Sequence, residues 1–138
     1  MSTTVPPAAE QVAPLTDTRI VPALIDGQSV HLPCPAWCVI DHVKENQKFL
    51  VDVWHSGPFM DLEAPRRGNS PMLMAYARLG VDPFSSDSAM RTPFLFIEDG
   101  SSAEGSYMEA EHAEQFADNL VAFAEQIRAM GRELKGGA

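Results

Sequence analysis

Apolar and polar positions alternate over several short stretches of the chain, and this alternation predicts β-strands. The apolar runs "IVPALI" and "SVHL" flank Asp26-Gly27, a dipeptide that favours a tight turn between two strands. A hairpin is therefore predicted over residues 20–32. It leads directly into Pro33 and Cys34, so the first cysteine lies at the end of a strand.

Three further stretches have strand-like patterns. The alternation in "KFLVDVWH" (residues 48–55) predicts a strand with Phe49, Val51, Val53 and His55 on one face, which places His55 at the tip of an inward face. "GPFMDLEAP" (57–65) and "FLFIED" (94–99) are predicted as two more strands, each bounded by turn residues.

The stretch "PMLMAYARLG" (71–80) is ambiguous. Ser70, Pro71 and Gly80 are typical of the start and end of a helix. However, a helix over these residues would carry apolar side chains on every side, and the neighbouring segments are predicted strands. We therefore interpret the stretch as a strand, with a helix as the alternative. The following "VDPFSSDSAMRTP" (81–93) has the turn chemistry of an exposed loop.

The last element predicted is a long helix from about residue 108 to residue 130. Its acidic residues crowd the first turns and its basic residues lie near the end, which complements the helix dipole. One face carries apolar residues at helical spacing: Ala113, Phe116, Ala117, Leu120, Phe123, Ala124 and Ile127.

The predicted fold class is α+β. We expect a small antiparallel sheet, a meander of about four to five strands, with a zinc-knuckle-like insertion and the long C-terminal helix packed on the sheet. Residues 1–18 have few large apolar groups and are predicted to be a disordered tail. A single domain is predicted over residues 19–131, followed by a flexible C-terminus over 132–138.

A group of potential metal ligands begins after the predicted hairpin and ends at the last residue of the predicted strand over residues 48–55. "CPAWCVIDH" (34–42) and the next histidine place Cys34, Cys38, His42 and His55 in the order C-x3-C-x3-H-x12-H. Two cysteines and two histidines are a common tetrahedral ligand set for structural zinc. In a straight helix Cys34 and His42 would lie about 12 Å apart along the axis, so a turn after Cys34 and a bend before His42 are predicted.

Two substitutions within this ligand set are open. Asp41 could replace His42 as an oxygen ligand, and His31 could take the place of His55. If only three ligands bind, the metal could be catalytic, with Asp41 or Asp52 as a general base. The chain has no H-E-x-x-H motif and no Gly-rich phosphate loop, so a structural ion is the preferred interpretation.

The chain also resembles a known group of proteins. The segments "CPAWCVIDH", "HSGP", "GVDPFSSD" and "YMEAEHAEQFADNLVAFAEQIRAM" are similar to those of an uncharacterised family of small actinobacterial proteins, over roughly residues 30–131. That family pairs a Cys-Pro-x-Trp-Cys-x-x-x-His segment with a C-terminal helix. Its usual Leu-Thr-Pro cap after a tyrosine is replaced here by Met108, Glu109 and Ala110. The resemblance implies a fold and a site, and no activity.

Charge and composition narrow the range of possible functions and partners. Nineteen acidic and ten basic residues give a net charge of −9, which disfavours nucleic acid as a partner. The N-terminal stretch has no secretory pattern and no segment reaches the length of a membrane span, so a cytoplasmic protein without a membrane partner is expected. We therefore expect a small, acidic, non-enzymatic protein that is stabilised by zinc and acts through protein–protein interaction, with a regulatory role as one option. A zinc-finger-like nucleic-acid binder and a thiol redox switch are the alternatives.

Overall fold

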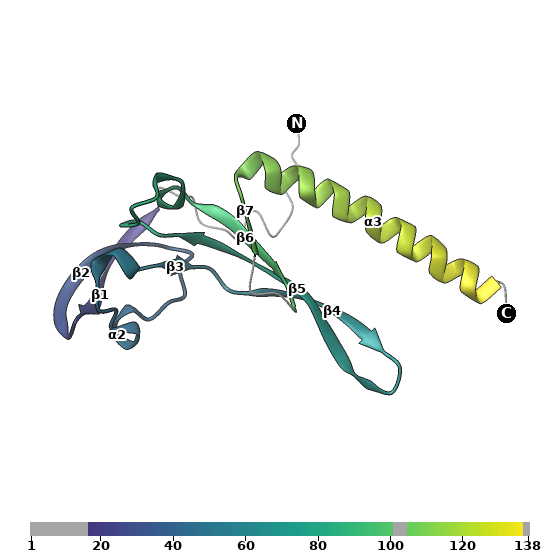
Figure 1. Ribbon diagram of the computed structural model, residues 1–138, viewed down its shortest axis with the longest axis horizontal. Helices are drawn as coiled ribbons and strands as arrows, with labels where there is room; N and C mark the ends of the chain where they lie inside the picture. The colour runs from purple at the N-terminus through teal and green to yellow at the C-terminus, as the bar shows by residue number, and fades with distance from the viewer. Residues whose placement is uncertain (1–16, 101–104, 137–138) are drawn as a thin grey trace. The chain divides into compact units, whose positions relative to one another are not determined.

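The computed structural model describes residues 17–100 and 105–136 (Figure 1). The chain divides into two compact units at the boundary between Tyr107 and Met108. The first unit contains, in chain order, β1 (Thr18–Ile25), β2 (Gln28–Pro35), α2 (His42–Glu45), the 3-10 turn η1 (Leu50–Asp52), β3 (His55–Ser56), β4 (Met60–Arg66), β5 (Asn69–Val81), the 3-10 turn η2 (Ser88–Arg91) and β6 (Phe94–Asp99). It also contains β7 (Gly105–Met108) except for the last residue, Met108. The helix α3 (Ala110–Gly136) belongs to the second unit.

The predicted first hairpin is confirmed, and it is longer than expected. β1 and β2 pair antiparallel from Thr18 opposite Pro35 to Ile25 opposite Gln28. Asp26 and Gly27 both have positive φ, 51° and 78°, as a tight two-residue turn requires. Of the predicted tail, residues 1–16 lie outside the described part of the chain, and β1 begins at Thr18.

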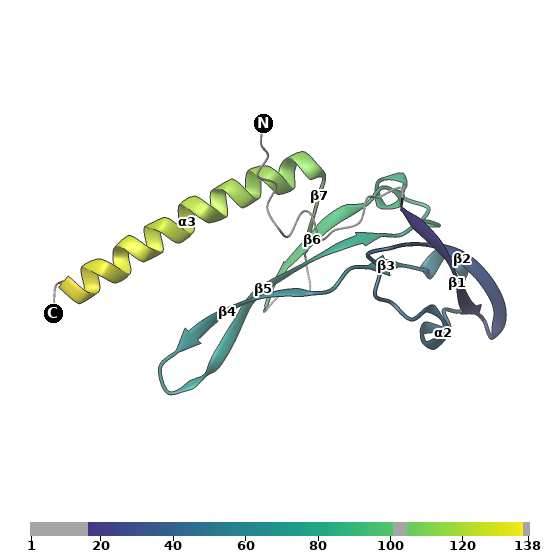
Figure 2. The same ribbon diagram turned by 180° about the vertical axis from the view of Figure 1, so that it is seen from behind.

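The second sheet has five antiparallel strands, and β5 is its longest. The order is β3-β5-β6-β7, and β4 also pairs with β5. Along one edge of β5, β4 pairs with residues 69–77 and β3 pairs with Gly80 and Val81; β6 pairs along the other edge. Figures 1 and 2 show the β4–β5 hairpin extending away from β3 and from the β1–β2 hairpin. The strand interpretation of residues 71–80 is confirmed.

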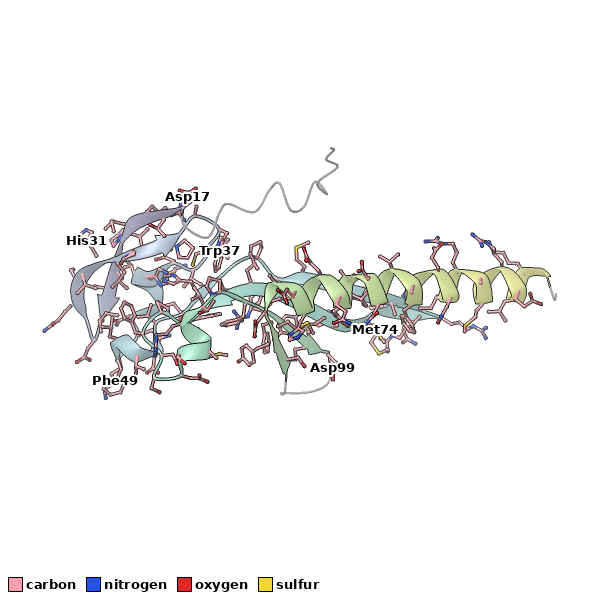
Figure 3. The ribbon with its side chains drawn as sticks, turned by 90° about the horizontal axis from the view of Figure 1, so that it is seen from above. Asp17, His31, Trp37, Phe49, Met74 and Asp99 are labelled. Atoms are coloured by element: carbon pink, nitrogen blue, oxygen red, sulfur yellow. The ribbon has the colours of Figure 1, made fainter. Side chains whose placement is uncertain are left out.

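The predicted strand over residues 48–55 is wrong for most of its length. Residues 50–52 form η1, in which Asp52 and Val53 donate backbone hydrogen bonds to Phe49 and Leu50. Phe49 is 56% exposed and lies at the periphery of its unit (Figure 3), while Val53 is buried. A strand tendency reflects the fit of side chains to a neighbouring strand. No described strand pairs along residues 48–54, so local hydrogen bonds determine their conformation.

Two small groups of buried side chains form the core of the first unit. One contains Cys34, Trp37, Cys38 and Val81; the other contains Ala23, Leu32 and Val53. The first group joins the end of β2 to the end of β5. The core therefore includes both cysteines, and a change at either one acts on packing as well as on chemistry.

The end of the chain differs from the prediction in two respects. β7 was not predicted, because four residues next to an uncertain helix start carry too short a pattern. α3 continues through Gly136, so residues 132–136, predicted to be flexible, are helical. Antiparallel sheets of two and five strands with one long C-terminal helix confirm the α+β class. The packing of α3 on the sheet and the single domain over residues 19–131 stay predictions.

A membrane span was not expected from the sequence. Among the residues that the structure describes, no helix combines the length and the apolar character needed to cross a bilayer.

Candidate metal centre

Four segments of the first unit bring the four predicted ligands together. Cys34 lies near the end of β2, Cys38 follows in the next turn, His42 is the first residue of α2, and His55 is the first residue of β3. One potential ligand atom from each residue lies within 4.8 Å of the others. All four residues are buried, with exposed fractions of 1%, 4%, 6% and 2%. The residues form a compact group of two sulfur and two nitrogen donors.

The backbone turns directly after Cys34, as predicted. Cys38 donates a backbone hydrogen bond of 3.0 Å to the carbonyl of Pro35, which closes a turn after Cys34. Val39 then donates to the carbonyl of Ser56 at 2.8 Å, which ties this loop to β3. Asp41 caps the N-terminus of α2, because its carboxylate accepts hydrogen bonds from Val43 and Lys44. The cap sets the direction of the turn that carries His42.

The spacing of the donor atoms suits a tetrahedral ion. His42 Nε2 lies 3.7 Å from Cys34 Sγ and 3.8 Å from Cys38 Sγ. With ordinary Zn–S and Zn–N bond lengths, a tetrahedral zinc ion holds a sulfur and a nitrogen ligand about 3.6 Å apart. The His42 and His55 rings are 4.9 Å apart between centroids and nearly perpendicular, at 83°. The two imidazole rings therefore meet edge to face.

One ring nitrogen of His55 has no hydrogen-bond partner among the described residues. His55 Nδ1 is fully buried, and a buried polar atom without a partner is costly. A metal ion bound at His55 Nδ1 would remove that cost. The residues present thus fit a bound metal both by their chemistry and by this unsatisfied atom.

Burial disfavours the charged forms of Cys34, His42 and His55 when no cation is bound. Burial, with the nearby Cys38, raises the pKa of the Cys34 thiol to about 11. Burial lowers the pKa of His42, and burial with the adjacent His42 lowers the pKa of His55 to about 4. Neutral imidazoles are ready to bind a metal, whereas a thiol must first lose its proton. Two thiolates and two imidazoles would balance the charge of a divalent cation.

The sulfur of Cys38 also receives support from the backbone. Ile40 donates its backbone N–H to Cys38 Sγ at 3.5 Å, an outer contact of the kind that stabilises a metal-bound thiolate. Both cysteines are free thiols, with no disulfide between them. Trp37 is buried in one apolar cluster with both cysteines. Trp54 is half-buried and donates a hydrogen bond to Glu45 at 3.0 Å.

The alternative ligands lie outside the group. Asp41 is exposed and caps α2. His31 is exposed on β2, opposite Pro22, and is labelled in Figure 3. Asp52, considered as a general base, is exposed in η1. The role of Asp41 as a cap was not foreseen, although an aspartate directly before a short polar helix is a usual capping signal.

Comparison with known proteins supplies a family and no function. Neither the search of curated proteins nor the search of solved structures found a match. One family model, described as Domain of unknown function (DUF6907), matches residues 18–136. The match runs from the start of β1 to the end of α3 and includes all four residues of the metal centre. The chain therefore belongs to the DUF6907 family, an uncharacterised family as the sequence resemblance implied.

Proposed function

We propose that the protein is a non-enzymatic domain, stabilised by one structural zinc ion, that acts through binding to protein. The convergence of four buried protein donors supports this proposal. Catalytic zinc usually has three protein ligands and a water in the fourth position. Four protein ligands complete the tetrahedron and leave zinc without a position for substrate.

Zinc is the metal that suits these donors best. Thiolate and imidazole together select zinc and other borderline or soft ions over magnesium and calcium. Zinc has no geometric preference of its own, so it accepts the arrangement that the chain provides. It also has no redox chemistry, which agrees with a role in holding the structure.

The position of the centre explains why a metal would be needed. Cys34 comes from the two-stranded sheet and His55 from the five-stranded sheet, so one ion would join the two sheets. Each core group contains only a few buried side chains. Structural zinc contributes about 10–16 kcal/mol in small zinc-binding domains, which is as large as the whole stability of a typical domain.

The other functions have less support. The net charge of −9 opposes the phosphate backbone of nucleic acid. A thiol switch needs a reactive thiolate, and the raised pKa of Cys34 keeps that thiol protonated when the metal is absent. We propose that the protein is cytoplasmic, where free thiols persist.

Native mass spectrometry with elemental analysis, on protein purified without added metal, tests the zinc proposal. We expect one zinc ion per chain in the wild type, and loss of zinc with loss of thermal stability in Cys34→Ser and His55→Ala. His31→Ala removes an exposed histidine close in sequence and is the matched control, which should keep its zinc. A wild type without metal would refute the zinc centre.

Cobalt substitution separates a closed centre from an open one. A Co²⁺ ion with two sulfur and two nitrogen ligands has visible absorption bands that report its coordination number. Adding azide should leave these bands unchanged if all four protein ligands bind. A shift of the bands with azide, or zinc retained in His55→Ala, would indicate an open position and favour an enzyme.

A further inference from the structure

Arg19 of β1 lies next to both cysteines of the metal centre. In the β1–β2 hairpin it pairs with Cys34. Directly paired residues of antiparallel strands place their side chains on the same face of the sheet, with Cβ atoms about 4.5–5.5 Å apart. The guanidinium of Arg19 also donates a hydrogen bond of 3.3 Å, from Nη2, to the backbone carbonyl of Cys38. One side chain of β1 is therefore beside the first cysteine and bonded to the backbone of the second.

The hydrogen bond to Cys38 connects β1 to the turn that carries the second thiol. The N–H of Cys38 closes this turn on the carbonyl of Pro35, and Arg19 holds the carbonyl of the same residue. A backbone contact also ties the start of β1 to this segment, because Ala36 donates to the carbonyl of Asp17 at 3.1 Å. That contact and the pairing of β1 with β2 use backbone atoms alone. The hairpin therefore does not depend on the side chain of Arg19, whereas the support of Cys38 does.

The charge of Arg19 favours the form of Cys34 that binds a metal. Burial and the nearby Cys38 raise the pKa of the Cys34 thiol, and the positive charge of Arg19 opposes this rise. Zinc binds the thiolate, and a cation beside a thiolate is favourable. Arg19 is exposed, so solvent screens its charge and limits the size of this effect.

We propose that Arg19 is a positioning residue of the metal centre, which fixes the turn that carries Cys38 and places a positive charge beside the Cys34 sulfur. This inference rests on the proposed zinc centre and adds a residue that is not itself a ligand. Contacts of this outer kind orient the ligands of a metal and typically contribute about 10–100-fold to its affinity. The exposure of Arg19 places its contribution near the lower end of that range.

Competition between the full chain and a chromophoric chelator for zinc tests this role. We expect the dissociation constant for zinc to rise about tenfold in Arg19→Met, which removes both the donor and the charge. Arg19→Lys keeps a charge and a donor and should restore most of the affinity. Arg66→Met is the matched control, because Arg66 also donates to a backbone carbonyl, that of Ser70 at 2.9 Å, but in the β4–β5 hairpin. This control should bind zinc as the wild type does.

Cobalt substitution supplies a readout that a purely structural role would not move. The near-ultraviolet band of Co²⁺ bound to thiolates is a charge transfer from sulfur to metal, and a cation beside the sulfur raises its energy. In Arg19→Met this band should shift to longer wavelength, while the visible bands that report the coordination number stay in place.

The outcomes separate this inference from the zinc proposal. Unchanged zinc affinity in Arg19→Met, an equal loss in Arg66→Met, or a charge-transfer band that does not move would each overturn the positioning role while the zinc centre stands. Circular dichroism of Arg19→Met with zinc should match the wild type, and a loss of folding would replace the positioning role with a structural one. A wild type that binds no zinc would refute the proposed function and this inference together.

Discussion

Trp54 and Glu45 join the two segments that carry the histidines of the metal centre. Trp54 Nε1 donates a hydrogen bond of 3.0 Å to Glu45 Oε1. Trp54 directly precedes His55, and Glu45 is the last residue of α2, the helix that begins at His42. The bond therefore holds α2 and β3 in a fixed relation while lying outside the donor group.

Removing this bond is expected to loosen the centre without removing a ligand. In Trp54→Phe an aromatic ring remains beside Arg78, whose guanidinium lies 5.1 Å from the Trp54 ring, but the donor is lost. We expect a loss of about 1 kcal/mol in the free energy of unfolding. We also expect a tenfold or larger loss of zinc affinity, since supporting contacts typically contribute about 10–100-fold.

Gln47→Ala is the matched control for this effect. Gln47 donates to the same oxygen of Glu45 at 3.0 Å, but it is not adjacent to a ligand. Competition with a chromophoric chelator measures both affinities. An equal loss of zinc affinity in the two variants would show that the affinity depends on the hydrogen bonds to Glu45 in general and not on the link to His55.

Zinc binding is expected to depend on pH through the thiols. Because the pKa of Cys34 is raised to about 11, this thiol is protonated at neutral pH and must release its proton to bind zinc. The pKa of His55 is lowered to about 4, so this imidazole is already neutral above pH 5 and releases none. The apparent affinity should rise at least about tenfold per pH unit between pH 6 and 8.

Calorimetry in buffers of different ionisation enthalpy counts the protons released on zinc binding. One or two protons per zinc ion at pH 7 agree with release from thiols. An affinity that does not change over this pH range would contradict the thiolate ligands.

A side chain at Gly80 is expected to destabilise the fold. A methyl group there would lie 2.7 and 2.9 Å from two ring carbons of Phe94, which is buried, and Gly80 pairs with Ser56 beside His55. Gly80→Ala should therefore cost about 1–3 kcal/mol in urea denaturation, as overpacking does. In the control Gly57→Ala, the nearest atom is 3.5 Å away and the contact is ordinary. Equal effects of the two variants would contradict this steric account.

Tyr76 and Glu98 connect β5 and β6 across the sheet. Tyr76 Oη donates to Glu98 Oε2 at 2.8 Å, and this hydrogen bond raises the pKa of Tyr76 above its ordinary value of 10. A raised pKa in the folded chain means that the stabilisation is complete below pH 10 and is lost as the pH rises through the folded value. Tyr76→Phe should lower the free energy of unfolding by about 1 kcal/mol at pH 7, and by less when the pH exceeds the pKa of Tyr76 in the folded chain.

Tyr107→Phe is the control for this prediction, because Tyr107 is 53% exposed. Urea denaturation at neutral and at alkaline pH measures both variants. A cost of Tyr76→Phe that stays constant with pH would contradict the role of its hydroxyl group.

Local sequence determined the elements whose signals come from adjacent residues. Asp26-Gly27 defined the first hairpin, because few other dipeptides adopt two positive φ values in succession. The period of the apolar residues defined the helix α3, and the spacing of Cys34, Cys38, His42 and His55 singled out the residues of the metal centre. Each of these signals is a residue type or a spacing within a short stretch of the chain, and it does not depend on which distant segments pack nearby.

Tertiary structure decided the rest. Residues 48–54 have the alternation of a strand, but no neighbouring strand pairs along them, so they form η1 and an extended link. Residues 71–80 have the end signals of a helix, yet β4, β3 and β6 pair along them and make them a strand. The choice among His31, His55, Asp41 and His42 depended on which side chains the sheets bury together. Burial and strand pairing join residues distant in the chain, and no local pattern specifies them.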